Sequence, residues 1–378
     1  MRGGKKTIAR AFAAAAAVLA AAVLLTGCKS GKTESGSSKS GEEQLFLTAP
    51  HRGRIQLEFA PKTSIFRGGM ADNFTVEHHK GQVSFCALGD NLIHDGIFTY
   101  ALNALGGDFN YLYEAVRDYV QSADIAILNH ETMLVADPGQ IGGYPAFGTP
   151  LGVGDAVFNA GFDVVSCATN HCMDRGGYAA NVTRQFYRDR GIACIGIQAY
   201  DEPDYIPYWI VERNGLRIAF LNYTYGTNGY PIPDDFPNMV HTLDSEWQVR
   251  SDIQAACADS DLQVMCVHMG NEYDFEPNDY QNYWMQVFME EGVDVVIGSH
   301  PHVLQPYGVL QGPNGRQMLV YYSLGNFISC QIPEECKIGG MALFTVSVDG
   351  RGVHFNYDRM KTRTVQEGLF YHTILSET

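Results

Sequence analysis

Five short apolar runs in this chain each end in a cluster of polar residues. The clearest run, residues 293–297, leads into Gly298-Ser299-His300-Pro301-His302. The other four runs end in these clusters: Gly89-Asp90-Asn91, Asn129-His130-Glu131, Asn170-His171 and His268. Short apolar runs of this kind are typical of buried strands, and open α/β sheets bind ligands beyond the carboxyl ends of their strands. The pattern predicts one active site assembled from five strand ends.

The segments around these runs predict the fold class. Amphipathic helical stretches are expected at 111–121, 153–160, 178–190, 245–258 and 280–291. Runs 205–211 and 216–223 flank Asn214-Gly215, which is a strong hairpin signal. Antiparallel-looking segments follow at 303–310, 317–323, 341–348 and 352–357. Strand–helix alternation early in the chain and hairpins late in it predict an α/β sandwich with mixed sheets.

The N-terminus has the features of an export signal. Four basic residues precede an uncharged apolar stretch, 11–25, which is shorter than the roughly 20 residues of a transmembrane helix. It ends in Leu25-Thr26-Gly27-Cys28, which resembles the lipobox of bacterial lipoproteins, in which the cysteine is acylated. The alternative is a plain secretory signal that ends near a cysteine.

These features predict three regions and a location. Residues 1–27 are expected to be a lipoprotein signal peptide, with lipidation at Cys28. Residues 28–80 are expected to be a flexible tether and N-terminal extension, because 29–44 are rich in Ser, Gly, Lys and Glu. Residues 81–378 are expected to form one folded domain, lipid-anchored at the extracytoplasmic face of the cell membrane.

Charge and cysteine content exclude some functions. The chain has 26 basic and 42 acidic residues, and loss of the signal's four basic residues brings its net charge from −16 to near −20. No Lys/Arg cluster occurs, which argues against a nucleic-acid partner. The absence of a C-x-x-C motif argues against a structural zinc ribbon. Cys330 and Cys336 are the most plausible disulfide pair.

The first two polar clusters contain candidate carboxylate ligands. Asp90 can ligate a metal or cap the next segment, and nearby His94 is either a further ligand or a surface residue. Glu131 can bridge two metals, although a surface acid in a loop is the alternative. Asn129 could orient the loop instead, and His130 could point back into the fold.

The later clusters supply the nitrogen ligands. Asn170 offers a carbonyl oxygen or a helix cap, His171 is a proton donor or a ligand, and Asp174 can orient that imidazole. His268 and the pair His300 and His302 are favoured as ligands. Mixed nitrogen and oxygen ligation suits two divalent ions (Mn, Zn or Fe) about 3.5–4 Å apart. Such a centre makes hydroxide near neutral pH, so hydrolysis of a phosphoester is the natural reaction, with an amide or ester next.

Taken in order, six motifs resemble those of the CapA family of capsule-synthesis proteins, which are associated with poly-γ-glutamate. The motifs lie at residues 89–90, 129–131, 169–174, 268–273, 298–305 and 322–327. The resemblance covers roughly residues 83–330. This family is similar to calcineurin-like metallophosphoesterases, which implies a four-layer α-β-β-α sandwich with two mixed sheets around a dinuclear centre.

The resemblance also implies a role for each site residue. Asp90 would bind the first metal, Glu131 would bridge, Asn170 and His268 would bind the second metal, His300 and His302 would complete the pair, and His171 would donate the proton. Phosphoesterases usually have Asp-x-His at the first motif, whereas this chain has Asp90-Asn91-Leu92. Either His94 substitutes for that histidine, or the first metal site is weak or empty.

The expected function is that of a membrane-tethered, extracytoplasmic CapA-like protein in capsule or poly-γ-glutamate biogenesis. One alternative is a metal-dependent cell-surface hydrolase of phosphoesters or γ-glutamyl amides, and another is a polymer-binding or assembly subunit without turnover. The sequence leaves open whether the protein is an enzyme. The expected partners are the membrane, capsule synthase subunits, and an anionic polymer or phosphoester. The negative charge disfavours polyglutamate away from the centre, so metals would mediate its binding.

Overall fold

The computed structural model describes residues 46–48, 54–59 and 81–376. The predicted signal peptide, Cys28 and the tether at 29–44 lie outside these residues and stay predictions. The N-terminal extension contributes two described strands, β1 (Phe46–Thr48) and β2 (Arg54–Phe59). None of the described helices has the length and apolar character that a membrane crossing requires.

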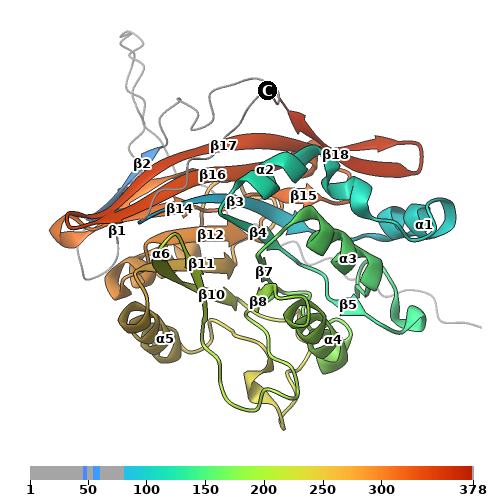
Figure 1. Cartoon of the computed structure of the whole chain (residues 1–378), viewed down its shortest axis with the longest axis horizontal. Coiled ribbons are helices and arrows are strands. Elements are labelled where there is room, and N and C mark those ends of the chain that lie inside the picture. The colour runs from blue at the N-terminus through green and yellow to red at the C-terminus, as the bar shows by residue number, and fades with distance from the viewer. Residues whose placement is uncertain (1–45, 49–53, 60–80, 377–378) are drawn as a thin grey trace, which may run out of the picture. The chain divides into compact units, whose positions relative to one another are not determined.

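Two mixed sheets of eight strands each form the centre of the fold (Figure 1). Sheet A has the order β1-β2-β13-β14-β12-β11-β10-β9. Four neighbouring strands in it run parallel: β10 (Leu216–Thr224), β11 (Leu262–His268), β12 (Val295–Ser299) and β14 (Gln317–Tyr321). β9 (Trp209–Arg213) and β13 (Tyr307–Gln311) are antiparallel to their neighbours β10 and β14.

Sheet B has the order β18-β17-β16-β3-β4-β7-β8, with β15 paired to β3. Its parallel strands are β3 (Gln82–Asn91), β4 (Ile125–Asn129), β7 (Val164–Ser166), β8 (Ala193–Ile195) and β15 (Asn326–Ile328). Its antiparallel strands are β16 (Ile338–Asp349), β17 (Gly352–Glu367) and β18 (Phe370–Ser376). A separate small pair consists of β5 (Leu134–Val135) and β6 (Thr149–Pro150).

Helices cover the outer face of each sheet (Figure 1). The outer core of sheet B includes α1 (Asp95–Ala104), the 3₁₀ helix η1 (Asn110–Val116), α2 (Arg117–Ser122), α3 (Leu151–Ala160) and α4 (Gly176–Arg188). The outer core of sheet A includes α5 (Glu246–Asp259) and α6 (Asp279–Glu291). A third apolar cluster combines residues of both sheets, such as Phe85 and Phe220. The predicted four-layer α-β-β-α sandwich is therefore confirmed.

The predicted elements agree with the structure best where a strong local signal exists. The hairpin at Asn214-Gly215 joins β9 to β10, and both residues have positive φ, 52° and 79°, as a type I′ turn requires. The helix predicted at 111–121 is divided into η1 and α2. The short strand β15, helix α1 and strand β18 were not predicted. β15 has only three residues, too few for a period to appear.

The expected disulfide between Cys330 and Cys336 is not formed, and both cysteines are free. The sulfur of Cys330 lies against Gly96 in α1 and hydrogen-bonds Tyr371 of β18. Cys336 is buried in a different element, η5 (Glu334–Lys337). Because the Cys330 sulfur packs against α1 and β18, its closeness to Cys336 in the sequence does not bring about a disulfide.

Candidate metal centre

The six predicted metal residues lie together at the carboxyl ends of the parallel strands. Sheet B and its loops supply Asp90, Glu131 and Asn170, whereas sheet A and its loops supply His268, His300 and His302. Parallel strands of two face-to-face sheets end at a common rim, so residues far apart in sequence meet there. The structure thus brings all six together, as the sequence predicts.

One group of ligand atoms comes from Asp90, Glu131 and His302. These three buried residues each offer an atom, and those atoms lie within 4.8 Å of one another. Asp90 Oδ2 is 3.0 Å from His302 Nδ1, while Asp90 Oδ1 accepts a hydrogen bond from Asn129 Nδ2 at 2.8 Å. Ser166 Oγ donates to Asn129 Oδ1, at 3.1 Å, which fixes the amide. Asn129 therefore orients Asp90 and does not join the centre itself.

A second group surrounds His268. Its Nε2 lies 2.8 Å from Asn170 Oδ1, and its Nδ1 lies 2.9 Å from Ser299 Oγ. The ring of His300 is 4.9 Å from that of His268, measured between centroids. Glu131 Oε1 is 3.8 Å from His268 Nε2 and 3.9 Å from His302 Nε2. Glu131 therefore lies between the two groups, where a bridging carboxylate would stand.

Two residues of the centre have buried polar atoms without partners. Neither carboxylate oxygen of Glu131 has a hydrogen bond, and Nδ1 of His300 has none. An unpaired buried polar group costs about 1–3 kcal/mol, and a charged one costs more. A divalent cation would satisfy these oxygen and nitrogen atoms at once, so the donor set fits such ions.

The pKa shifts of the side chains in the centre also favour a bound cation. Burial raises the pKa of Glu131 well above its usual value, and the charge of Asp90 adds to this effect. Burial lowers the pKa of His302, but Glu131 and Asp90 together raise it to about 9. Burial, then His302 and His171, lowers the pKa of His300 to about 3. The centre thus holds a proton on His302 where a cation could replace it.

The Gly298–His302 loop has an unusual backbone. His300 and His302 have φ values of 97° and 59°, in the left-handed region that favours glycine. Such residues cost about 1–3 kcal/mol each and cluster at functional sites. At Gly298, a Cβ atom would lie 2.0 Å from the carbonyl oxygen of Tyr322, so only glycine fits. The loop is strained in a way that brings both imidazoles to the centre.

His171 and Asp174 form a pair beside the centre. His171 Nδ1 lies 2.7 Å from Asp174 Oδ2, which also accepts a hydrogen bond from the backbone N–H of Phe147 at 2.8 Å. The Phe147 ring packs edge-on against the imidazole, at 4.8 Å between centroids. Because the carboxylate can only accept, Nδ1 carries the hydrogen and Nε2 is left for other chemistry. This is the orientation that the sequence predicts for Asp174.

Two histidines of the polar clusters do not join the centre. His130 is buried among core side chains, edge-on to Tyr187 at 5.3 Å, and burial lowers its pKa to about 3. His94 Nδ1 lies 3.1 Å from the carbonyl oxygen of Leu92 and 3.2 Å from the N–H of Cys330. Among the described residues, His94 belongs to neither group of ligand atoms.

Two residues near the centre had no assigned role in the sequence. Glu272, which is exposed, forms a further group of ligand atoms with His300 and His302. Asn326 is fully buried, and its Oδ1 lies 3.0 Å from His302 Nδ1. The signal that could have identified Asn326 is the one that identified the others, because it comes shortly after the apolar run 318–322.

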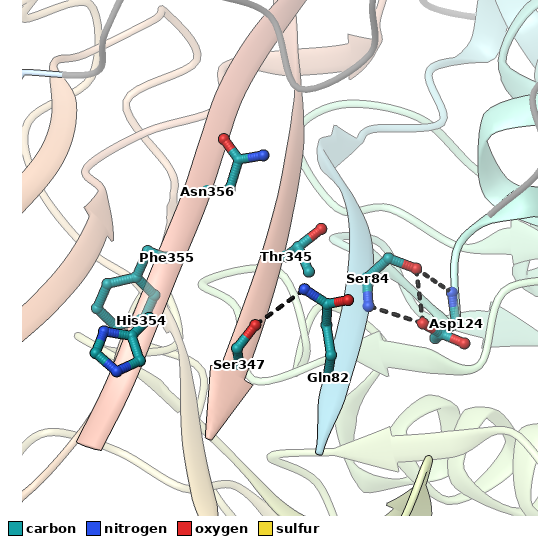
Figure 2. A pocket seen from close by; sticks show the side chains of 8 residues that line it. All are labelled: Gln82, Ser84, Asp124, Thr345, Ser347, His354, Phe355 and Asn356. Carbon is teal, nitrogen blue, oxygen red and sulfur yellow. Dashed lines mark hydrogen bonds between the residues drawn. The ribbon is translucent and has the colours of Figure 1, made fainter. Parts of the chain in front are cut away.

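A separate polar cavity of about 240 Å³ lies at the amino ends of β3 and β4 (Figure 2). Its lining residues are Gln82, Ser84, Asp124, Thr345, Ser347, His354, Phe355 and Asn356. Asp124 Oδ2 accepts hydrogen bonds from the N–H and the hydroxyl of Ser84, both at 2.8 Å. None of its lining residues is among those with an unpaired buried side-chain atom.

Comparisons with known proteins agree with these motifs. Residues 84–331 match the sequence model of a family described as bacterial capsule synthesis protein PGA_cap. PGA biosynthesis protein CapA of Bacillus subtilis (strain 168) is 29% identical over 194 residues, which are 50% of this chain and 49% of that protein. Capsule biosynthesis protein CapA of Bacillus anthracis is 29% identical over 202 residues, which are 52% of this chain and 47% of that protein. The chain thus covers about half the length of these relatives.

Solved structures with a related fold are more distant. The NAD nucleotidase of Haemophilus influenzae has a TM-score of 0.43 and 13% identity, over 78% of this chain and 60% of that one. The 5′-nucleotidase of Candida albicans has a TM-score of 0.40 and 11% identity, over 75% of this chain and 52% of that one. Both TM-scores lie below 0.5, and neither similarity says anything about activity.

Proposed function

Since this chain belongs to the family of bacterial capsule synthesis proteins, we propose that it acts in capsule or poly-γ-glutamate biogenesis as a metal-dependent hydrolase. The observation that carries the proposal is the buried carboxylate of Glu131, which has no hydrogen bond and lies between two groups of ligand atoms. The substrate class is a phosphoester or a γ-glutamyl amide of an anionic polymer.

The ligands would divide between two ions. Asp90, Glu131 and His302 would hold the first, whereas Glu131, Asn170, His268 and His300 would hold the second. Two such ions supply a hydroxide near neutral pH and bind an anionic oxygen of the substrate. This arrangement also explains how a protein with a net charge of −16 could attract an anionic substrate.

His171 would provide the proton that the leaving group needs. Asp174 holds Nδ1–H of His171 at 2.7 Å, and Phe147 limits rotation of the ring. In this role both ring nitrogens carry a hydrogen: Nδ1–H donates to Asp174, and the hydrogen on Nε2 is the one that would pass to the leaving group. Asp174 is therefore a positioning residue, and His171 is the group that would transfer the proton.

The proposed location follows from the N-terminal sequence. We place the folded domain at the extracytoplasmic face of the cell membrane, held by a lipid on Cys28. Its proposed partners are the membrane itself and capsule synthase subunits, with no role for nucleic acid. Radiolabelled fatty acid should be incorporated by the wild-type chain and not by Cys28→Ala.

Metal analysis and a substrate screen test the proposal. We expect about two divalent ions per chain in full-length protein prepared without chelator, and less than about half an ion would contradict it. His302→Ala should lose metal and hydrolysis together. His171→Ala should keep its metal and lose hydrolysis, since its role is proton transfer.

His354→Ala is the matched control, because His354 is an exposed histidine in the separate cavity of Figure 2. It should leave metal content and hydrolysis unchanged. If neither His302→Ala nor His171→Ala affects either measurement, the proposed centre is wrong. If the wild type binds metal, hydrolyses no substrate, and binds polymer in an EDTA-sensitive way, the assembly-subunit alternative replaces it.

A further inference from the structure

Asn326 lies beside Asp90 in sheet B. Strand β15 pairs in parallel with β3, and Asn326 is the register partner of Asp90. Both side chains are fully buried. His302 Nδ1 is 3.0 Å from Asn326 Oδ1 and also 3.0 Å from Asp90 Oδ2. Three possible ligand atoms, one nitrogen and two oxygens, therefore lie close together at the carboxyl end of β3.

The amide of Asn326 has a fixed orientation. Its Nδ2 donates to Gln331 Oε1 at 2.8 Å and to the carbonyl oxygen of Cys336 at 2.9 Å. These two acceptors use both N–H groups of the amide. A flipped amide would place its oxygen against two other acceptors. The side-chain oxygen is thus directed at Asp90 and His302 by its own hydrogen bonds.

The contacts around His302 Nδ1 leave one hydrogen for two acceptors. Nδ1 carries at most one hydrogen, and both Asp90 Oδ2 and Asn326 Oδ1 face it. Ligand atoms bound at about 2.1 Å and at right angles around an ion lie about 3.0 Å apart, which matches both spacings. A cation can satisfy the nitrogen and the two oxygens together, whereas a proton cannot.

We propose that Asn326 is a ligand of the first metal position through Oδ1, and that it replaces the histidine missing from Asp90-Asn91-Leu92. The inference rests on the metal centre of the proposed function. It removes the need for His94, whose Nδ1 already faces Leu92 and Cys330. The first position then has four protein ligands: Asp90, Glu131, His302 and Asn326.

Titration of the full-length protein with Mn²⁺ alone tests this assignment. The electron paramagnetic resonance signal of free Mn²⁺ reports the number and affinity of bound ions. The wild type should bind about two ions. Asn326→Ala should weaken one of them at least about tenfold, and His300→Ala should weaken the other.

Two further variants separate a ligand from a packing role. Asn326→Asp keeps an oxygen for the ion but loses the N–H donors to Gln331 and Cys336, so it should retain both ions. Gln331→Ala removes one acceptor of the amide, whereas the carbonyl oxygen of Cys336 still accepts from Nδ2 and keeps Oδ1 in place, so this variant should also retain both ions. Loss of an ion in Gln331→Ala or Asn326→Asp, but not in Asn326→Ala, would overturn the assignment.

A crystal structure of the Mn²⁺-loaded wild type needs no variant. An anomalous peak within about 2.3 Å of Asn326 Oδ1 supports the ligand role, and an occupied first position more than about 3 Å away overturns it. If the wild type binds two ions and Asn326→Ala keeps both at unchanged affinity, only the inference on Asn326 fails. If the wild type binds none, the proposed function fails as well.

Discussion

Strand β4 has a buried carboxylate near each of its ends, and only the one near its amino end accepts hydrogen bonds. At the amino end, the Asp124 carboxylate accepts two hydrogen bonds from Ser84 in the cavity of Figure 2. At the carboxyl end, the Glu131 carboxylate is completely buried and accepts none. Both acids are next to the same strand, β4, so the sheet itself does not cause the difference.

Hydrogen bonding to the carboxylate thus distinguishes the separate polar cavity from the candidate metal centre. Among the residues that line the cavity, no buried side-chain atom lacks a hydrogen-bond partner, so a ligand would find no unsatisfied buried group there. A buried carboxylate without a partner destabilises the fold until something binds it. Unpaired buried atoms are therefore better evidence for a site here than the size of a cavity. The predictions below test this contrast.

The largest effect is expected for Glu131→Gln, which keeps the side chain's shape and removes its charge. The affinity for metal should fall by more than about 100-fold, because the carboxylate between the two groups is lost. Above about pH 9, where His302 has lost its proton, the metal-free variant should be more stable than the wild type by about 1–3 kcal/mol, since a buried carboxylate without a partner is gone. Metal titration and urea unfolding in chelator measure the two effects. If the metal-free variant is instead less stable than the wild type at that pH, the proposed contrast between Glu131 and the hydrogen-bonded Asp124 is wrong.

The second effect is a pH dependence of metal binding. Without metal, the pKa of His302 is raised to about 9, mainly by Glu131 and Asp90 acting against burial. Below that pH an ion must displace the proton, so affinity should rise about tenfold per pH unit between about 6.5 and 9. Calorimetry in buffers of different ionisation enthalpy should detect proton release on binding. Binding without proton release at pH 7 would refute this account of His302.

The same raised pKa predicts how the stability of the metal-free protein depends on pH. A group whose pKa is higher in the folded state stabilises the fold fully below its unfolded pKa, about 6.5 for histidine. That stabilisation from His302 is lost as the pH rises through about 9. Metal-free protein should therefore lose stability across this window, and Glu131→Gln should lose less of it.

A third prediction concerns a buried polar group that is fully paired. Asn222 Oδ1 accepts from the N–H of Ala168 at 2.7 Å, and its Nδ2 donates to the carbonyl oxygen of Cys266 at 3.1 Å. Asn222→Ala should lower the free energy of unfolding by about 1–3 kcal/mol, the opposite sign to Glu131→Gln. Urea unfolding in chelator measures it. An unchanged urea midpoint would show that the presence of hydrogen-bond partners does not decide whether removal of a buried polar side chain stabilises or destabilises the fold.

The smallest effect is expected in the separate cavity. Ser347→Ala removes the hydrogen bond that Gln82 donates to Ser347 Oγ, at 2.9 Å and only partly buried. Its stability should change by no more than about 0.5 kcal/mol, and metal binding should be unchanged. A loss of metal in Ser347→Ala would mean that the two ends of the sheet are coupled.

The sequence was sufficient to predict that the candidate ligands lie together where each of them follows the end of a strand. Asp90, His268 and His300 each close an apolar run, and the rule that ligands bind beyond the carboxyl ends of strands placed them together. The same rule could not tell whether His130 or Glu131 faces the centre. These neighbours point in different directions, and only packing against Tyr187 decides that His130 faces the core.

Asn326 shows a different limit of sequence reasoning. Its strand has three residues, and its partner Asp90 lies 236 positions earlier, so no local pattern joins them. The missing Asp-x-His histidine suggested a nearby replacement, His94, because sequence favours neighbours. The structure instead brings an oxygen from the far end of the chain.

The assembly of the centre from both sheets has a consequence for when a metal ion can be bound. Asp90 and His302 are 212 positions apart, and Asn170 and His268 are 98 apart. A partly synthesised chain contains its first candidate ligands well before the last ones exist, so it cannot yet hold an ion at the proposed centre. Metal uptake then reports completed folding. Geometry, ligand type and metal availability together decide which divalent ion a set of ligands binds, so the metal supply where the chain finishes folding would help to determine the ion at the proposed centre.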